Sequence, residues 1–185
     1  MLTQLIVLMG LVLLLLSPGM AAPESNGQSR AELVKDARDS LELLYASTPQ
    51  AKDLRARSVA VLVFPDILKA GLIIGGSGGD GVLFSPEGKV LGYYNAGSLS
   101  FGLQAGAENH AEALFLTTRD ALEYLESSEG WSIGTGPTIT VIDQGAGGDF
   151  STTTLRSDVF AFIYGQKGLM GGIGLQGQKI TRLKP

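Results

Sequence analysis

The residues whose spacing comes closest to a catalytic pattern lie in GLIIGGSGGDGVLF, Gly71 to Phe84. Gly75, Ser77 and Gly79 fit G-x-S-x-G, the turn that presents a nucleophilic serine between a strand and a helix in serine hydrolases. Such a serine needs a general base, and His110 is the only histidine in the chain. The residues around His110 give no independent sign of catalysis. A hydrolase would turn over activated esters, and Ser77→Ala would abolish that activity.

The same stretch fits a second fingerprint. Gly76, Gly78 and Gly81 match G-x-G-x-x-G, whose glycines bind the pyrophosphate of a dinucleotide at a helix N-terminus. Val82 to Pro86 cannot begin a long helix, and Ser98 to Ala107 lacks the required acidic residue. Both fingerprints need a helix after the glycines, so we interpret the glycines as turn-forming residues and expect no enzyme.

The N-terminus is predicted to be a signal peptide covering residues 1–21. Leu5 to Leu16 is uncharged and is shorter than the roughly 20 residues that span a bilayer. Met1 to Gln4 contains no lysine or arginine, which keeps an uncleaved anchor as the alternative. Residues 22–30 form a polar spacer, and 31–185 form one domain. We expect an exported protein that is periplasmic or secreted.

Composition excludes several classes of function. The chain has no cysteine, so it has neither a disulfide framework nor a thiolate metal site. A net charge of −4 argues against nucleic acid as a partner. Asp143, Asp149 and Asp158 stand at turn positions without the dense oxygen ligands of a calcium loop. We expect no metal and no cofactor.

Three helices are predicted. Ala31 to Ala46 carries one apolar stripe, and its mixed charges favour docking on the protein core over lying in a membrane interface. A second helix is expected from Pro49 to about Arg57, with Lys52 and Arg55 exposed. Thr118 to Ser127 reads as a third helix with a threonine cap.

The remaining segments predict strands. Val59 to Phe64 is a buried strand ended by Pro65, and a glycine-rich turn separates strands at Ala70 to Gly75 and Gly81 to Ser85. Ser98 to Glu108 alternates strictly and reads as one strand. Further elements are a turn at Ser85 to Gly88 and strands at Lys89 to Tyr94, Thr138 to Ile142, Asp158 to Tyr164, Leu169 to Leu175 and Gln178 to Leu183. The predicted fold is an α+β, β-rich single domain with a curved antiparallel or barrel-like sheet.

The order of these motifs resembles the SYLF domain family. The resemblance rests on VLVFPDILKAGLIIGGSGGDGVLF, GSLSFGLQAGAE, a helix ending in EGW, and FAFIYGQKGLMGGIGLQGQKI. It covers Ala31 to Lys184 and implies a non-enzymatic lipid-binding module. Eukaryotic members bind phosphoinositide (phosphatidylinositol) membranes and some bind actin, and bacterial relatives are commonly exported envelope proteins. Phosphoinositide specificity does not transfer, and a signal of bacterial type makes actin an unexpected partner.

The sequence therefore leads to a hypothesis about lipid binding in the cell envelope. A phospholipid membrane surface would be contacted by basic residues, together with the N-terminal amphipathic helix or a glycine loop. The candidate basic residues are Lys52, Arg55, Lys167, Lys179, Arg182 and Lys184. The alternative is a structural envelope protein that binds a protein partner through its strand edges.

Overall fold

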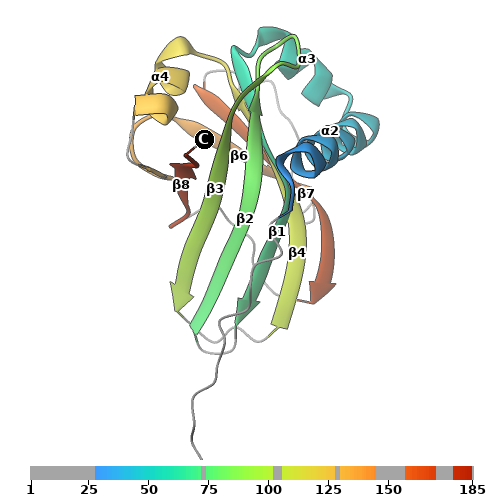
Figure 1. The fold of residues 1–185 in the computed structure, drawn as a ribbon, viewed down its shortest axis with the longest axis vertical. Helices are drawn as coiled ribbons and strands as arrows, with labels where there is room; N and C mark the ends of the chain where they lie inside the picture. Colours follow the sequence, from blue (N-terminus) through green and yellow to red (C-terminus); the bar gives the residue numbers. More distant parts are fainter. Residues whose placement is uncertain are drawn as a thin grey trace, which may run out of the picture.

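The computed structural model describes residues 28–71, 74–101, 106–127, 130–144, 157–169 and 177–184, which form an α+β domain (Figure 1). The elements are α2 (Arg30–Ser47), α3 (Gln50–Arg57), β1 (Ala60–Gly71), β2 (Ile74–Phe84), β3 (Val90–Phe101), β4 (Gly106–Leu116), α4 (Arg119–Ser127), β5 (Trp131–Ser132), β6 (Ile139–Asp143), β7 (Val159–Leu169) and β8 (Lys179–Arg182). The predicted fold class is confirmed. The predicted signal segment lies outside the described residues. None of the described helices is long and apolar enough to cross a membrane.

The strands form one sheet in the order β5-β8-β3-β2-β1-β4-β7-β6. Its described pairs are antiparallel except for β6 and β7, which run parallel. The sheet is strongly curled. In a flat sheet β8 and β4 would lie about 19 Å apart, at roughly 4.8 Å per strand. Nevertheless, Gln178 beside β8 donates a 3.0 Å hydrogen bond to Glu112 on β4. The face that carries this bond is therefore concave, and we call it the inner face.

Helix α2 covers the opposite, outer face. Its buried side chains Leu33, Leu41 and Leu44 join a core cluster with outer-face residues such as Val63 and Phe115. This confirms that the amphipathic helix docks on the core of its own domain. The inner face holds a second cluster, in which Leu62, Leu114 and Ala161 of the sheet meet Leu125 of α4 and Trp131. Trp131 is fully buried in this cluster.

Several helix and turn boundaries follow from short local sequence signals. The Ser85 to Gly88 turn closes with a 2.9 Å bond from the Gly88 amide to the Ser85 carbonyl, and Gly88 takes the positive φ expected of glycine. Thr118 caps α4 by accepting a hydrogen bond from the Ala121 amide at 3.3 Å. The first two predicted helices also form, at Arg30–Ser47 and Gln50–Arg57.

The prediction that Pro65 ends the first strand was wrong. Strand β1 continues to Gly71, and the register against β4 shifts between Phe64 and Ile67. This irregularity takes Pro65 and Asp66 out of the ladder, where the missing amide of proline costs no hydrogen bond. A bulge therefore allows one long strand where the sequence suggested a stop.

The predicted glycine-rich turn was also wrong, because Gly75 to Gly81 lies inside β2. A Cβ at Gly79 would collide with the Asp66 carbonyl, and a Cβ at Gly81 would collide with the Phe64 ring. These glycines allow the bulged part of β1 to pack closely against β2. Neither catalytic fingerprint has the helix that it requires, since β2 leads directly through a turn into β3.

Ser98 to Glu108 is not one strand. Its first residues end β3 at Phe101 and its last residues begin β4 at Gly106. Ser98 and Glu108 both lie on the inner face, so the alternation stays in phase across the break, and the sequence pattern conceals it. The connection at 102–105 and the part of the predicted Leu169 to Leu175 strand that follows Leu169 fall outside the described residues.

Candidate functional site

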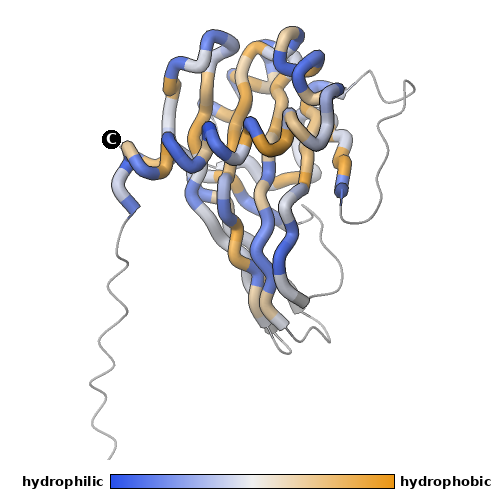
Figure 2. The backbone as a smooth tube through the Cα atoms, turned by 90° about the vertical axis from the view of Figure 1, so that its right-hand side faces the viewer, coloured by the Kyte–Doolittle hydropathy of each residue, from blue (hydrophilic) through white to orange (hydrophobic). Residues whose placement is uncertain are grey.

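Below α2, no described helix covers the outer face of the sheet near the ends of β1 to β4 and β7 (Figures 1 and 2). We call this area the tip face. It consists of two rows of register partners: Lys179, Gly97, Gly78, Leu68, Asn109 and Lys167 in the upper row, and Leu99, Gly76, Ala70 and Ala107 in the lower row.

The upper row has a lysine at each end. Lys179 on β8 pairs with Gly97, and the row continues across the sheet to Lys167 on β7. Both lysines were candidates from the sequence, in segments with no visible relation to each other. The register places them on one face, with Leu68 between them.

The lower row is apolar. Leu99 is 75% exposed and Leu68, in the row above, is 51% exposed, although large aliphatic side chains are usually buried. Gly76 and Gly78 on β2 lie between the two leucines, so no side chain projects from the strand that separates them. An exposed apolar surface flanked by charge is typical of an interaction site.

The acidic residues of the outer face lie farther from the tip. Asn109 donates a 2.7 Å hydrogen bond to Asp66, and Asn95 donates a 2.8 Å hydrogen bond to Asp80. Both aspartates line a groove of about 870 Å³ beneath α2, together with Asp36 and Asp39 of that helix. Four aspartates therefore line this groove, together with Lys167.

The other four predicted basic residues lie elsewhere. Lys52 is exposed on α3, at the opposite end of the molecule from the tip (Figure 1). Arg55 was expected to be exposed but is half-buried. Its guanidinium donates to the Pro86 carbonyl at 3.2 Å and lies over the Tyr45 ring. Arg55 therefore ties α3 to the β2–β3 turn and to α2.

Arg182 and Lys184 follow Lys179 in and after β8. The Arg182 guanidinium lies 6.0 Å from the centre of the Tyr94 ring. The carbonyl of Lys184 accepts a 2.8 Å hydrogen bond from Arg30, which links the end of the chain to the start of α2. Of the six candidates, the sheet register brings only Lys167 and Lys179 into one row.

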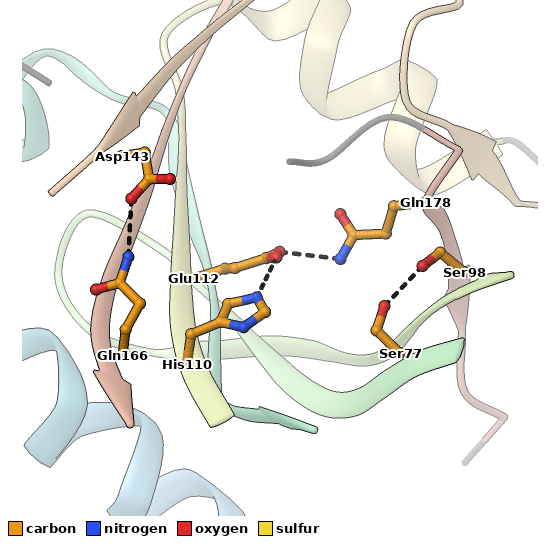
Figure 3. A network of polar contacts seen from close by, with 7 residues as sticks. All are labelled: Ser77, Ser98, His110, Glu112, Asp143, Gln166 and Gln178. Atoms are coloured by element: carbon orange, nitrogen blue, oxygen red, sulfur yellow. Dashed lines mark hydrogen bonds and ion pairs between the residues drawn. The ribbon is translucent and has the colours of Figure 1, made fainter. Parts of the chain in front are cut away.

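The inner face near the tip is polar, which was not predicted from the sequence. Glu108, His110 and Glu112 occupy alternate positions on β4 and are only 2–5% exposed. His110 Nε2 lies 3.0 Å from one Glu112 oxygen, and Gln178 donates to the other (Figure 3). The alternation of polar residues in GAENHAE was visible in the sequence, but nothing showed that this face pointed inward.

Ser77 is not placed as a nucleophile. Its hydroxyl lies 2.7 Å from the hydroxyl of Ser98, its register partner on β3, and His110 instead contacts Glu112 (Figure 3). Among the residues that the structure describes, no three His, Asp or Glu side chains form a group that could hold a metal ion.

Comparison with known families agrees with the resemblance drawn from the sequence. Residues 97–184, about half of the chain, match the family described as "Ysc84: Las17-binding protein actin regulator". The matched region includes β4, β7 and β8, which supply Asn109, Lys167 and Lys179 to the tip face. No curated protein matches the chain. The family is one of binding domains, and over residues 97–184 the chain belongs to this SYLF (Ysc84) domain family.

Proposed function

We propose that the protein is a non-enzymatic lipid-binding module that attaches to membrane surfaces through its tip face. The observation that carries this proposal is the row with Lys167 and Lys179 at its ends, directly above the exposed apolar row that contains Leu99. The apolar row would enter the interface between headgroups and acyl chains, and the lysines would contact lipid phosphates.

The spacing of the rows suits this arrangement. Residues two apart on a strand are about 7 Å apart, so the lysine row lies about 7 Å above the apolar row. Interfacial segments bury their apolar side chains about 5–10 Å deep. With Leu99 at that depth, Lys167 and Lys179 stand at headgroup level, and the carboxylates of Asp66 and Asp80 lie farther from the membrane.

The expected affinity is weak. Two lysines near an anionic surface contribute about 1 kcal/mol each. Burial of two leucines that are already partly covered adds about 1–2 kcal/mol each. The sum of about 4–6 kcal/mol corresponds to a dissociation constant of roughly 0.04–1 mM. Since the lysines supply at most about half of this free energy, apolar contact is essential to the proposal.

The amphipathic helix expected to help bind the membrane has another role in this structure. Most apolar side chains of α2 are buried against the sheet. Among the large ones, Leu43 is the exception, because it is 69% exposed. Lowering α2 onto a membrane would require the core to open. We therefore assign α2 to the core. Within the proposal the protein is exported, and the surface that it contacts is a membrane of the cell envelope.

The test is co-sedimentation of the purified protein with vesicles of increasing anionic fraction, at low and at physiological salt. Leu68→Asp/Leu99→Asp should abolish binding at both salt concentrations, whereas Lys167→Glu/Lys179→Glu should weaken it at least tenfold at low salt. The matched controls are Leu43→Asp on α2 and Lys52→Glu/Arg57→Glu on α3, which change the same kinds of exposed residue outside the two rows of the tip face.

Two outcomes would contradict the proposal: equal effects of tip and control variants, or no binding to any vesicle. The second would favour a protein partner at a strand edge. Val141 supports this alternative, because it is 45% exposed on the edge strand β6. An edge contact through backbone hydrogen bonds should be insensitive to salt.

A further inference from the structure

The inner face of the sheet changes from apolar to polar along β4. Leu116 and Leu114 belong to the inner core cluster, and the next inner-facing positions toward the tip are Glu112, His110 and Glu108. A core that served stability alone would continue with apolar side chains, because buried carboxylates are costly unless they are paired. The polar end of the interior needs another explanation.

The neighbouring strands continue this polar layer. Glu108 on β4 pairs with Lys69 on β1, Lys69 pairs with Ser77 on β2, and Ser77 pairs with Ser98 on β3. All four share the inner face at one level of the sheet. Glu108 is buried, whereas the other three are half-buried, so the polar layer is partly open to solvent. His110 and Glu112 lie deeper, above it.

Several deep polar atoms have no hydrogen-bond partner among the described residues. They are Glu108 Oε1, His110 Nδ1, Gln178 Oε1 and the Tyr94 hydroxyl. The Nε2–H of a neutral His110 donates to the Glu112 carboxylate, which leaves Nδ1 as an acceptor. The Gln178 amide group donates to the same carboxylate, which leaves its oxygen as an acceptor. These three buried acceptors therefore have no hydrogen-bond donor among the described residues, although buried polar atoms are nearly always paired.

We propose that this end of the half-barrel interior binds a small polyhydroxylated group, such as a sugar or polyol. Hydroxyls donate to Glu108 and His110 and accept from the Ser77 and Ser98 hydroxyls, so one group meets both needs. The two glutamates disfavour a phosphate, and Lys69 in the same layer disfavours an ammonium ion. We call the set Lys69, Ser77, Ser98, Glu108 and His110 the interior site. It does not depend on the lipid proposal, since soluble sugars test it directly.

His110 is the only histidine of the chain, so its imidazole NMR signals can be assigned directly and report on the interior site. Long-range proton–nitrogen NMR of His110 should show the Nε2–H tautomer in the free protein. Glucose and glycerol are the probes, and either should shift the His110 Nδ1 signal saturably. Glu108→Gln should weaken the response at least tenfold, and the control Glu123→Gln on the exposed side of α4 should leave it unchanged.

If Glu108→Gln does not fold, Ser77→Ala/Ser98→Ala serves instead, because it removes both partners of one hydrogen bond and leaves neither hydroxyl unpaired. It should also weaken the response. Vesicles that carry a glycosylated lipid, compared with plain phosphatidylcholine vesicles, separate a lipid-linked sugar from a free one. A response to either source supports the site. A shift that never saturates, or that persists undiminished in the variants, overturns it, as does no response to any probe.

Discussion

The hydroxyl groups of Ser40 and Tyr164 lie 2.8 Å apart in a buried hydrogen bond that joins α2 to β7. The two residues are 124 positions apart in the chain, and each is buried within the outer-face core. This bond fixes α2 across the sheet just above the tip face. The position of α2 thus depends on polar contacts as well as on its apolar stripe.

Removing either partner should lower the free energy of unfolding by about 1–2 kcal/mol, because the remaining hydroxyl stays buried without a partner. Ser40→Ala and Tyr164→Phe test this in urea unfolding followed by the fluorescence of Trp131, the only tryptophan. The double variant should lose less than the sum of the two single losses. Strict additivity would show that the hydroxyls do not interact.

Alkaline pH should destabilise the protein through its buried tyrosines. Burial raises the pKa of Tyr164 well above its ordinary value near 10, and it raises the pKa of Tyr45 and Tyr94 in the same direction. The unfolded chain then loses tyrosine protons at lower pH than the folded chain. The stabilisation is complete below about pH 10 and is lost as the pH rises above it. Tyr164→Phe should flatten this decline, and an unchanged pH profile would contradict the burial of that hydroxyl.

Asp158 should stabilise the fold at neutral pH. Its carboxylate accepts bonds from the Thr138 amide at 2.9 Å and hydroxyl at 2.7 Å, and these bonds lower the pKa of Asp158. A lowered pKa gives stability that is present above the unfolded value near 3.9 and is lost as the pH falls through the folded value. Asp158→Ala should therefore lower the free energy of unfolding by about 1 kcal/mol at pH 7.

The loss in Asp158→Ala should shrink as the pH falls below about 4, where the wild-type carboxylate becomes protonated. Glu123→Ala on the exposed side of α4 is the control and should have little effect at either pH. A loss that is independent of pH would mean that Asp158 acts through packing.

Replacing Gly81 or Gly78 of β2 by alanine should have different effects on the stability of the fold. At Gly81 a Cβ would collide with the Phe64 ring and would lie 2.7 Å from the Val63 carbonyl, so Gly81→Ala should cost about 1–3 kcal/mol of stability. At Gly78 the nearest atom to a Cβ is the Ala96 carbonyl oxygen at an ordinary 3.6 Å, and Gly78→Ala should be neutral or slightly stabilising. Thermal unfolding of both variants makes the comparison, and equal losses would argue against close packing at Gly81.

Much of the architecture was predictable from local patterns. The apolar stripe of α2, the Ser85 to Gly88 turn and the threonine cap of α4 are short-range signals. Each was interpreted correctly because the physics that produces it acts within a few residues. The order of motifs was also sufficient to indicate the SYLF family.

The predictions that were wrong depended on contacts between segments far apart in the chain. Pro65 and the glycines from Gly75 to Gly81 look like strand breakers, yet they lie inside β1 and β2 because a bulge on one strand packs closely against the other. The sequence also shows Lys167 and Lys179 only as two separate basic residues. Strand register places them on one face, because pairing across the sheet depends on contacts far apart in the chain.

By itself, the sequence determined the composition of the elements, the docking of α2 and the kinds of side chain available for contact. The tertiary structure alone decided which of them meet. Glu108, His110 and Glu112 face a polar interior because the sheet curls far enough for Gln178 to reach across it. Curl, register and bulges arise from the packing of the whole sheet, and no single segment encodes them.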